Sequence, residues 1–203
     1  MKSIICFIRH GQTDWNIVGR MQGREEVPLN QTGINQAKEV AHFLAEAKSK
    51  GVLWDKVVSG PLSRARDTAK IIANGIDCKN VYSDPRLTER DFGELSGYYY
   101  NEYSRAVYEN VEGVASIETV ESLVERVSDF IRTDVKPGER VIVVTHGGVG
   151  RIYAENSPHS ENVGEIGMFH NCHTAIYTFD GENVVLERYN LSAEQIAREG
   201  IGL

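Results

Sequence analysis

Residues 140–148 read RVIVVTHGG, a run of β-branched residues followed by a histidine and two glycines. β-branched side chains favour strands, and an apolar run without polar alternation is typical of a strand buried on both faces. Residues 3–8 form a second short apolar run, followed by Arg9, His10 and Gly11. We therefore expect two buried parallel strands, each with a histidine at its carboxyl end.

Helix-like segments alternate with these strands along the chain. The spacing of apolar residues predicts helices over 32–50, 61–75, 119–135 and 147–154, with a short terminal helix after Ser192. Further strands are expected over 56–59, 80–83, 174–179 and 184–189, the last two forming a hairpin around Asp180 and Gly181. This order predicts a three-layer α/β/α fold with a mostly parallel central sheet and a C-terminal antiparallel hairpin.

Three helix starts can be predicted from single residues. Thr32 is suited to cap the first helix, and Pro61 is suited to open the second because its missing N–H is not needed in a first turn. Ser192 and Gln195 have the spacing of a capping box.

Composition bounds the class of protein. The 203 residues are 41% hydrophobic and 25% charged, with a net charge of −7, which excludes a disordered chain and disfavours a nucleic-acid partner. The chain can form one domain over 1–203. The three cysteines are widely spaced, as expected of reduced thiols, and the apolar run over 4–8 is too short for a signal or a membrane span. We expect a cytoplasmic protein without a membrane partner; its oligomeric state is left open.

The chemistry gathers at the predicted strand ends. Arg9 and His10 follow one strand, His146 and Gly147 follow another, and Arg64 lies one turn into the helix after a third. Ligands bind beyond the carboxyl ends of the strands in such folds, so these residues predict a cationic pocket for an anion. A helix beginning at Gly147 would add free N–H groups to that pocket. The remaining cluster, HNCH over 170–173, lacks a second half with ligand spacing, so no metal site is expected.

Residues 7–33, FIRHGQTDWNIVGRMQGREEVPLNQTG, resemble the opening signature of the histidine phosphatase superfamily, the phosphoglycerate mutase-like proteins. Three further blocks resemble that family in order: SGPLSRARDTA over 59–69, LTERDFGELSG over 87–97 and VVTHGG over 143–148. The second block departs from the family at Gly60 and Pro61, so Arg64 is its best match and Arg66 the fallback. Four blocks in order make coincidence very improbable.

The resemblance implies a role for each matching residue. His10 is implied to be the nucleophile that forms a phosphohistidine, and Glu89 the general acid, with Glu94 as its rival. The implied clamp on the phosphoryl oxygens consists of Arg9, Arg64, His146 and Asn16. Gln22 and Gly23 are implied to approach the substrate, Gly23 through its backbone. Cationic side chains take the part of a metal, so neither metal nor cofactor is expected.

The resemblance leaves two reactions open, hydrolysis of the phosphohistidine or transfer to a second phosphoglycerate. Phosphoglycerate mutases carry a lysine and an arginine pair after the third block, where this chain has Tyr99 and Tyr100 and no arginine pair. The sequence therefore favours a phosphomonoesterase acting on a small phosphorylated metabolite. A cofactor-dependent mutase is the runner-up, and a non-catalytic phospho-ligand binding module is the third reading. The tyrosine-rich segment 98–116 is either a substrate-selecting cap or a helix packed on the core.

Overall fold

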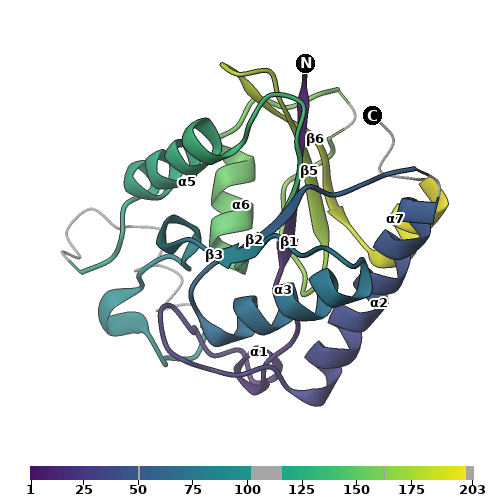
Figure 1. Ribbon diagram of the computed structural model, residues 1–203. Coiled ribbons are helices and arrows are strands. Elements are labelled where there is room, and N and C mark those ends of the chain that lie inside the picture. The colour runs from purple at the N-terminus through teal and green to yellow at the C-terminus, as the bar shows by residue number, and fades with distance from the viewer. Residues whose placement is uncertain (50, 102–115, 162, 200–203) are drawn as a thin grey trace.

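The computed structural model describes residues 1–49, 51–101, 116–161 and 163–199 (Figure 1). Within them, six strands form one sheet in the order β3-β2-β4-β1-β5-β6. The strands are β1 (Ser3–Arg9), β2 (Lys56–Ser59), β3 (Val81–Ser83), β4 (Arg140–Thr145), β5 (Thr174–Phe179) and β6 (Val184–Leu191). The predicted mostly parallel sheet is confirmed, because β3, β2, β4 and β1 pair in parallel and only β5 and β6 pair antiparallel.

The place of β1 in the sheet matters for the site. On one side it pairs in parallel with β4, so that Arg9 stands opposite Thr145. On the other side it pairs antiparallel with β5, so that Ile8 stands opposite Thr174. The carboxyl ends of β1 and β4 therefore lie at the same edge as the amino end of β5.

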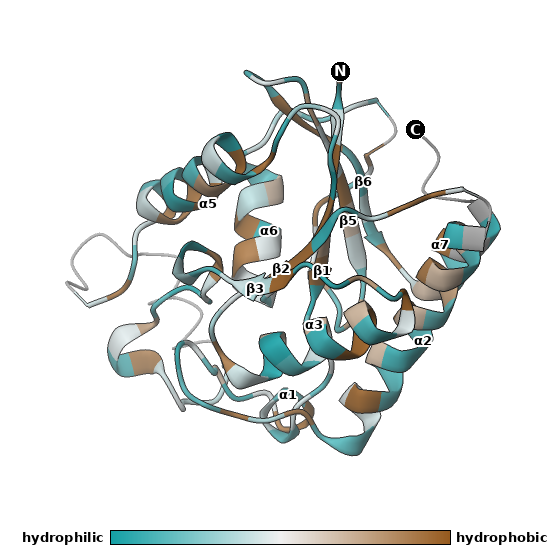
Figure 2. Ribbon diagram, viewed as in Figure 1, coloured by the Kyte–Doolittle hydropathy of each residue, from teal (hydrophilic) through white to brown (hydrophobic). Residues whose placement is uncertain are grey.

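Helices cover both faces of the sheet (Figure 1). One face carries α5 (Val120–Asp134) and α6 (Gly147–Glu155), and the other carries α2 (Gln31–Ser49), α3 (Ser63–Gly75) and α7 (Ala193–Glu199). Alternate β1 residues face the two layers: Ile5 and Phe7 belong to the core under α5 and α6, while Cys6 and Ile8 belong to the core under α2 and α3. Figure 2 shows the same arrangement, with apolar strands between helices that are polar on their outer sides.

The connections between these elements contain three short helices, α1 (Asp14–Ile17), η1 (Pro85–Leu87) and η2 (Gly93–Leu95). All three lie in segments that follow a strand. They carry residues toward the edge where β1 and β4 end.

Two of the predicted helix starts were wrong by one or two residues. α2 begins before Thr32, and the Asn30 side chain accepts a hydrogen bond from Gly33 N at 2.9 Å, so Asn30 rather than Thr32 acts as its cap. α3 begins at Ser63, two residues after Pro61. The capping box at the start of α7 is confirmed, since Ser192 N donates to Gln195 Oε1 and Gln195 N donates to Ser192 Oγ.

Gly11 and Gly33 bring the loop after β1 into direct contact with the first turn of α2. A Cβ on Gly11 would collide with the backbone carbonyl of Gly33, and backbone cannot swing aside as a flexible side chain can. We expect Gly11→Ala to lower the free energy of unfolding by about 3 kcal/mol in urea titrations, because the two backbones must separate. Gly164→Ala is the control, since nothing lies within 4 Å of the added methyl. Equal stability of the two variants would contradict the contact.

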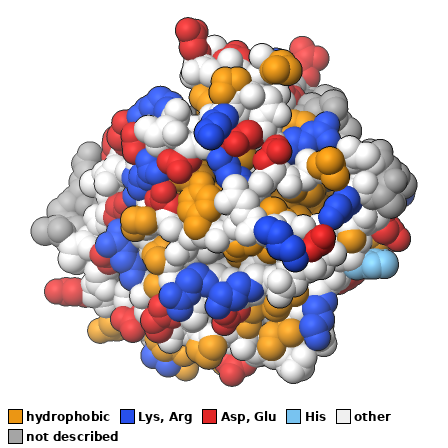
Figure 3. All heavy atoms as spheres, in the orientation of Figure 1, with side chains coloured by type: hydrophobic (Ala, Val, Ile, Leu, Met, Phe, Trp, Pro, Cys, Tyr) orange, Lys and Arg blue, Asp and Glu red, His pale blue; other side chains and the backbone are white. Residues whose placement is uncertain are grey.

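The surface does not carry charge of a single sign. On the face shown in Figure 3, basic and acidic side chains are interspersed. A site for an anion must therefore be built locally rather than supplied by the overall charge.

Among the described helices, none combines the length and apolar character needed to cross a membrane.

Candidate active site

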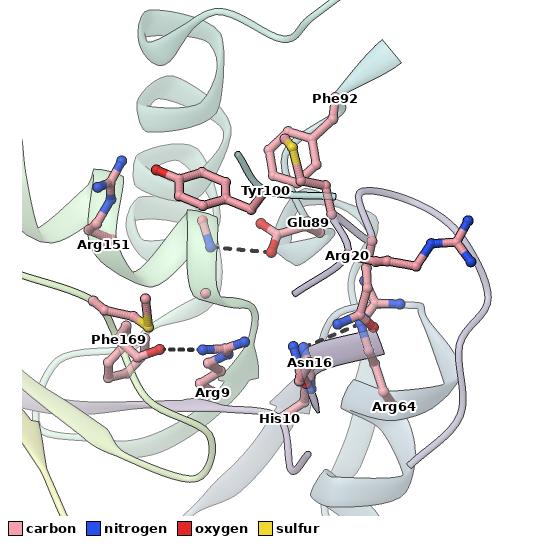
Figure 4. Close-up of a pocket in the computed structure, with 15 residues that line it drawn as sticks. Arg9, His10, Asn16, Arg20, Arg64, Glu89, Phe92, Tyr100, Arg151 and Phe169 are labelled. Carbon is pink, nitrogen blue, oxygen red and sulfur yellow. Dashed lines mark hydrogen bonds between the residues drawn. The ribbon is translucent and has the colours of Figure 1, made fainter. Parts of the chain in front are cut away.

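A cavity of about 440 Å³ opens at the edge where β1 and β4 end (Figure 4). Seven of the residues singled out in the sequence line it: Arg9, His10, Asn16, Gln22, Arg64, Glu89 and Gly147. Gly23 and His146 do not line the cavity, but each contacts a residue that does. Gly23 O accepts a hydrogen bond from Arg64, and the ring of His146 packs against that of His10. The alternatives lie elsewhere, since Arg66 and Glu94 are exposed and outside the cavity.

His10 is the central residue of the cavity and is 2% exposed. Its Nδ1 lies 2.7 Å from the carbonyl oxygen of Gly11. A carbonyl can only accept, so Nδ1 carries the ring proton and Nε2 keeps its lone pair. Arg64 Nε donates to this Nε2 at 3.3 Å. Burial, followed by the charges of Arg64 and Arg9, holds the pKa of His10 well below its usual value, so the ring is neutral at physiological pH.

The two arginines beside His10 are held by backbone carbonyls. Arg9 Nη1 donates to Phe169 O at 2.6 Å, and Arg64 donates to Glu25 O at 2.6 Å and to Gly23 O at 2.8 Å. Burial lowers the pKa of Arg64 to about 10, so this guanidinium still carries its charge at neutral pH. Two fixed cations therefore flank the neutral imidazole, and Gly23 acts by positioning one of them.

His146 stands behind His10, with the ring centroids 5.3 Å apart. Its ring is fully buried, and neither ring nitrogen has a hydrogen-bond partner among the described residues. A Cβ on Gly60 would lie 2.6 Å from the backbone oxygen of Leu87 and 2.9 Å from His146 Nε2, so only glycine fits after β2 beside this ring. Unpaired buried polar groups are rare outside functional sites, so these nitrogens are candidates for contact with a ligand.

The side chain of Asn16 is oriented by its neighbours. Its Oδ1 accepts hydrogen bonds from Thr13 N at 3.0 Å, Thr13 Oγ1 at 3.2 Å and Asn171 Nδ2 at 3.2 Å. With the oxygen occupied, the amide NH₂ is the end left for the cavity, where it would donate to an anion. Asn171 also donates to His10 O at 2.9 Å. No sequence pattern pointed to Asn171, which lies in a loop more than a hundred residues from His10 and Asn16.

Asn171 is expected to act as a positioning residue. Asn171→Ala should lower kcat/KM for a phosphate ester by about tenfold, because Asn16 then loses a donor that orients it. Asn16→Ala should reduce kcat/KM at least as much, and the double variant should lose clearly less than the sum of the two single losses, the remainder reflecting the separate Asn171–His10 O bond. Steady-state kinetics on the three variants form a double-mutant cycle. Fully additive losses would show that Asn171 does not act through Asn16.

Glu89 and the glycines after β4 are fitted to each other. The carboxylate accepts from Gly148 N and Val149 N, both at 3.2 Å, and from Arg90 N at 2.8 Å. A Cβ on Gly148 would lie 2.7 Å from Glu89 Oε1, and one on Gly147 would lie 3.1 Å from the Arg9 guanidinium. The first turn of α6 therefore binds Glu89 with two of the N–H groups that the sequence assigned to an anion, while Gly147 and Gly148 both line the cavity.

Three tyrosines near the cavity, Tyr98, Tyr99 and Tyr100, begin the segment in which the sequence predicts either a cap or a packed helix. Most of segment 98–116 lies outside the described residues, Tyr103 and Tyr108 included. Tyr98, Tyr99 and Tyr100 are exposed, so packing on the core is wrong for these three, and only Tyr100 lines the cavity. Within the described residues, no group of three or more His, Cys, Asp and Glu side chains could hold a metal.

Burial of the two histidines makes stability depend on pH. The pKa values of His10 and His146 are lowered mainly by burial, so below about pH 6.5 the unfolded chain binds more protons than the folded one. Stability is then complete above that pH and falls on acidification, by up to about 1.4 kcal/mol per pH unit for each histidine. Urea unfolding from about pH 7 to about pH 5.5 measures this slope.

A matched pair of variants assigns the slope. His146→Gln should remove one histidine's share, whereas His42→Gln, at an exposed position of α2, should keep the full slope. An unchanged slope in His146→Gln would contradict the neutral buried ring.

Comparison with known proteins identifies the family. A family model described as "Histidine phosphatase superfamily (branch 1)" matches residues 5–192. The chain belongs to this superfamily. The resemblance of the four sequence blocks is thereby confirmed, and they surround one cavity.

The relatives of this chain include proteins named as phosphatases and proteins named as phosphoglycerate mutases. A Bacillus subtilis protein named uncharacterized phosphatase PhoE is 34% identical over 145 residues, 70% of this chain and 71% of that protein. A metal-independent phosphoserine phosphatase of Arabidopsis thaliana is 37% identical over 159 residues, 72% of this chain and 65% of that protein. The fold matches a phosphoglycerate mutase of Bacillus anthracis with a TM-score of 0.78 at 19% identity, covering 97% and 96% of the two chains. A Cronobacter sakazakii protein named probable phosphoglycerate mutase GpmB is 32% identical over 154 residues, 70% of this chain and 69% of that protein. By its superfamily and these sequence relatives, the chain is an enzyme, either a phosphatase or a mutase.

Proposed function

We propose that this enzyme hydrolyses phosphate monoesters of small metabolites through a phosphohistidine on His10, without a metal. The main support is the hydrogen bond from His10 Nδ1 to Gly11 O, 2.7 Å long. It keeps the ring proton on Nδ1 and so leaves the lone pair on Nε2. A neutral imidazole with a fixed tautomer need lose no proton before it attacks; the long Arg64 Nε hydrogen bond to Nε2, at 3.3 Å, is exchanged for one to the phosphoryl group as substrate enters.

In the first step, His10 Nε2 attacks phosphorus while the bond from phosphorus to the ester oxygen breaks. The leaving oxygen takes a proton from Glu89. Oε1 of that carboxyl already accepts from Arg90 N and Val149 N, whereas Oε2 accepts only from Gly148 N, so Oε2 is the oxygen suited to carry the proton. In the second step, water attacks the phosphohistidine, Glu89 takes back a proton, and phosphate leaves as the N–P bond breaks.

The clamp on the phosphoryl oxygens consists of Arg9, Arg64, Asn16 and His146. Both guanidinium groups are fixed by carbonyls before substrate arrives, so no reorganisation is needed when charge develops. Each such donor contributes a factor of about 10²–10³ to the rate in comparable sites. These charges supply the electrostatic stabilisation that a metal ion supplies in other phosphatases.

The first test is release of inorganic phosphate from p-nitrophenyl phosphate, phosphoserine and a phosphoglycerate panel, with and without chelator. Release that persists in chelator supports the proposal. Release lost in chelator would overturn the metal-free mechanism. Interconversion of phosphoglycerates without release would make the enzyme a mutase, as several relatives are named. Binding of these esters without either reaction would leave a phospho-ligand binding module.

A further inference from the structure

Apolar side chains share the cavity with the charged groups around His10. Five large ones line it: Met21, Phe92, Tyr100, Met168 and Phe169. In Figure 4, Phe92 and Phe169 lie on opposite sides of the cavity and Tyr100 extends between them. Tyr100 and Met168 are 52% and 67% exposed. Apolar surface left exposed at a cavity mouth is typical of a binding site.

Backbone hydrogen bonds hold Tyr100 in this place. Tyr100 N donates to Gly19 O at 2.8 Å, and Met21 N donates to Tyr98 O at 2.8 Å, so the two segments form a short ladder. The Arg20 guanidinium adds a clip, since it lies 4.2 Å from the Trp15 ring centroid and donates to Gly97 O at 2.7 Å. A half-exposed tyrosine on a pinned backbone can offer its ring to a ligand at little entropic cost.

One cation lies among these apolar groups. Arg151, on the second turn of α6, lines the cavity with a side chain that is 34% exposed and lies 3.6 Å from Glu155. An exposed i,i+4 pair of this kind contributes little, so it does not prevent a second carboxylate from approaching. The cavity lining holds four arginines and one glutamate, so its electrostatics favour anionic ligands.

We propose that the preferred substrates are phosphate monoesters of ring-bearing alcohols with a second acidic group at the far end. This inference rests on the proposed function, which sets the phosphoryl group at His10. The leaving group then extends outward, where Tyr100, Phe92 and Met168 cover the ring and Arg151 meets the acid. Aliphatic esters without a ring bind the same phosphoryl clamp but leave this outer surface wet.

The ring preference is tested with ethyl phosphate and benzyl phosphate, whose leaving alcohols have similar acidity. We expect kcat/KM for benzyl phosphate to exceed that for ethyl phosphate by roughly tenfold, from the apolar area removed from water. Tyr100→Ala should reduce this ratio to about threefold or less. Tyr98→Ala is the matched control, because Tyr98 is similarly exposed but does not line the cavity. A ratio near one in the unmodified enzyme, or equal ratios in both variants, would overturn the ring site.

The acid preference is tested with 4-carboxybenzyl phosphate. Its kcat/KM should exceed that of benzyl phosphate by about threefold to fivefold, and added salt should shrink this advantage. Arg151→Gln should bring the ratio to about one. Glu155→Gln breaks the same helix pair but keeps the cation, so it should keep the advantage. Equal ratios in these two variants would show that the helix pair, and not the cation, is responsible.

Binding separates this inference from the proposed function. Calorimetric titration with ethyl-, benzyl- and 4-carboxybenzylphosphonate measures the same preferences without turnover. Absent hydrolysis of all three esters would overturn the proposed function, while the order of phosphonate affinities still decides the outer site. Hydrolysis of all three at equal kcat/KM, with equal phosphonate affinities, would overturn the outer site alone.

Discussion

His10→Ala is expected to lower kcat for phosphate release by roughly 10⁴-fold or more, because the reaction then loses the atom to which phosphorus is transferred. The same variant should form no phosphoenzyme when the unmodified enzyme does. Quenching with base and detecting the phosphohistidine by mass spectrometry tests this directly, since the N–P bond survives at high pH. The two readouts together distinguish a lost nucleophile from weakened binding.

The control for this variant is His42→Gln, on the exposed side of α2. It removes a histidine without touching the cavity, so turnover and phosphoenzyme should remain at the level of the unmodified enzyme. Activity retained in His10→Ala would show that water attacks the ester directly. A phosphoenzyme mapped to another histidine would place the nucleophile elsewhere.

Glu89→Gln is expected to have an effect that depends on the leaving group. For an alkyl phosphate, kcat should fall by about 10²–10⁴, because the alkoxide then leaves without a proton. For p-nitrophenyl phosphate the first step should be nearly spared, since p-nitrophenolate leaves unaided, while the second step lacks its base. Rapid mixing should therefore show a burst of p-nitrophenolate of about one per active site, with accumulation of phosphoenzyme.

Glu94→Gln is the matched control, since Glu94 belongs to the same sequence block but is exposed and outside the cavity. It should show neither a burst nor a leaving-group effect. Equal losses for both esters without a burst in Glu89→Gln would mean that this carboxylate holds α6 in place and transfers no proton.

Much of the fold could be predicted because its signals are local. The apolar runs at β1 and β4 are dense in β-branched residues, and the period of α5 leaves Leu123, Val127, Phe130 and Ile131 buried. The first residue of α2 could not be predicted, because Asn30 and Thr32 are both good N-caps. Which of them caps the helix depends on the contact between Gly11 and Gly33, which is not visible in the sequence.

The site was predictable where a residue directly follows a strand. His10 and His146 do so, and parallel pairing brings them together. Asn171 could not be found in this way, because it reaches His10 only through the antiparallel pairing of β5 with β1. The steric reason for Gly60 and Gly148 was also hidden, since Gly60 is required by the backbone carbonyl of Leu87 and the ring of His146, and Gly148 by the carboxylate of Glu89.

The position of β1 between β4 and β5 has a consequence for biosynthesis. The strand that precedes His10 is translated well before both of its neighbours, β4 and β5, which lie more than 130 residues further along the chain. Pairings so distant in sequence form slowly. We expect a nascent chain to hold β1 unpaired, with its apolar face open to chaperones, until β4 and β5 have emerged. The pocket around His10 is thus completed only after β4 and β5 have been made.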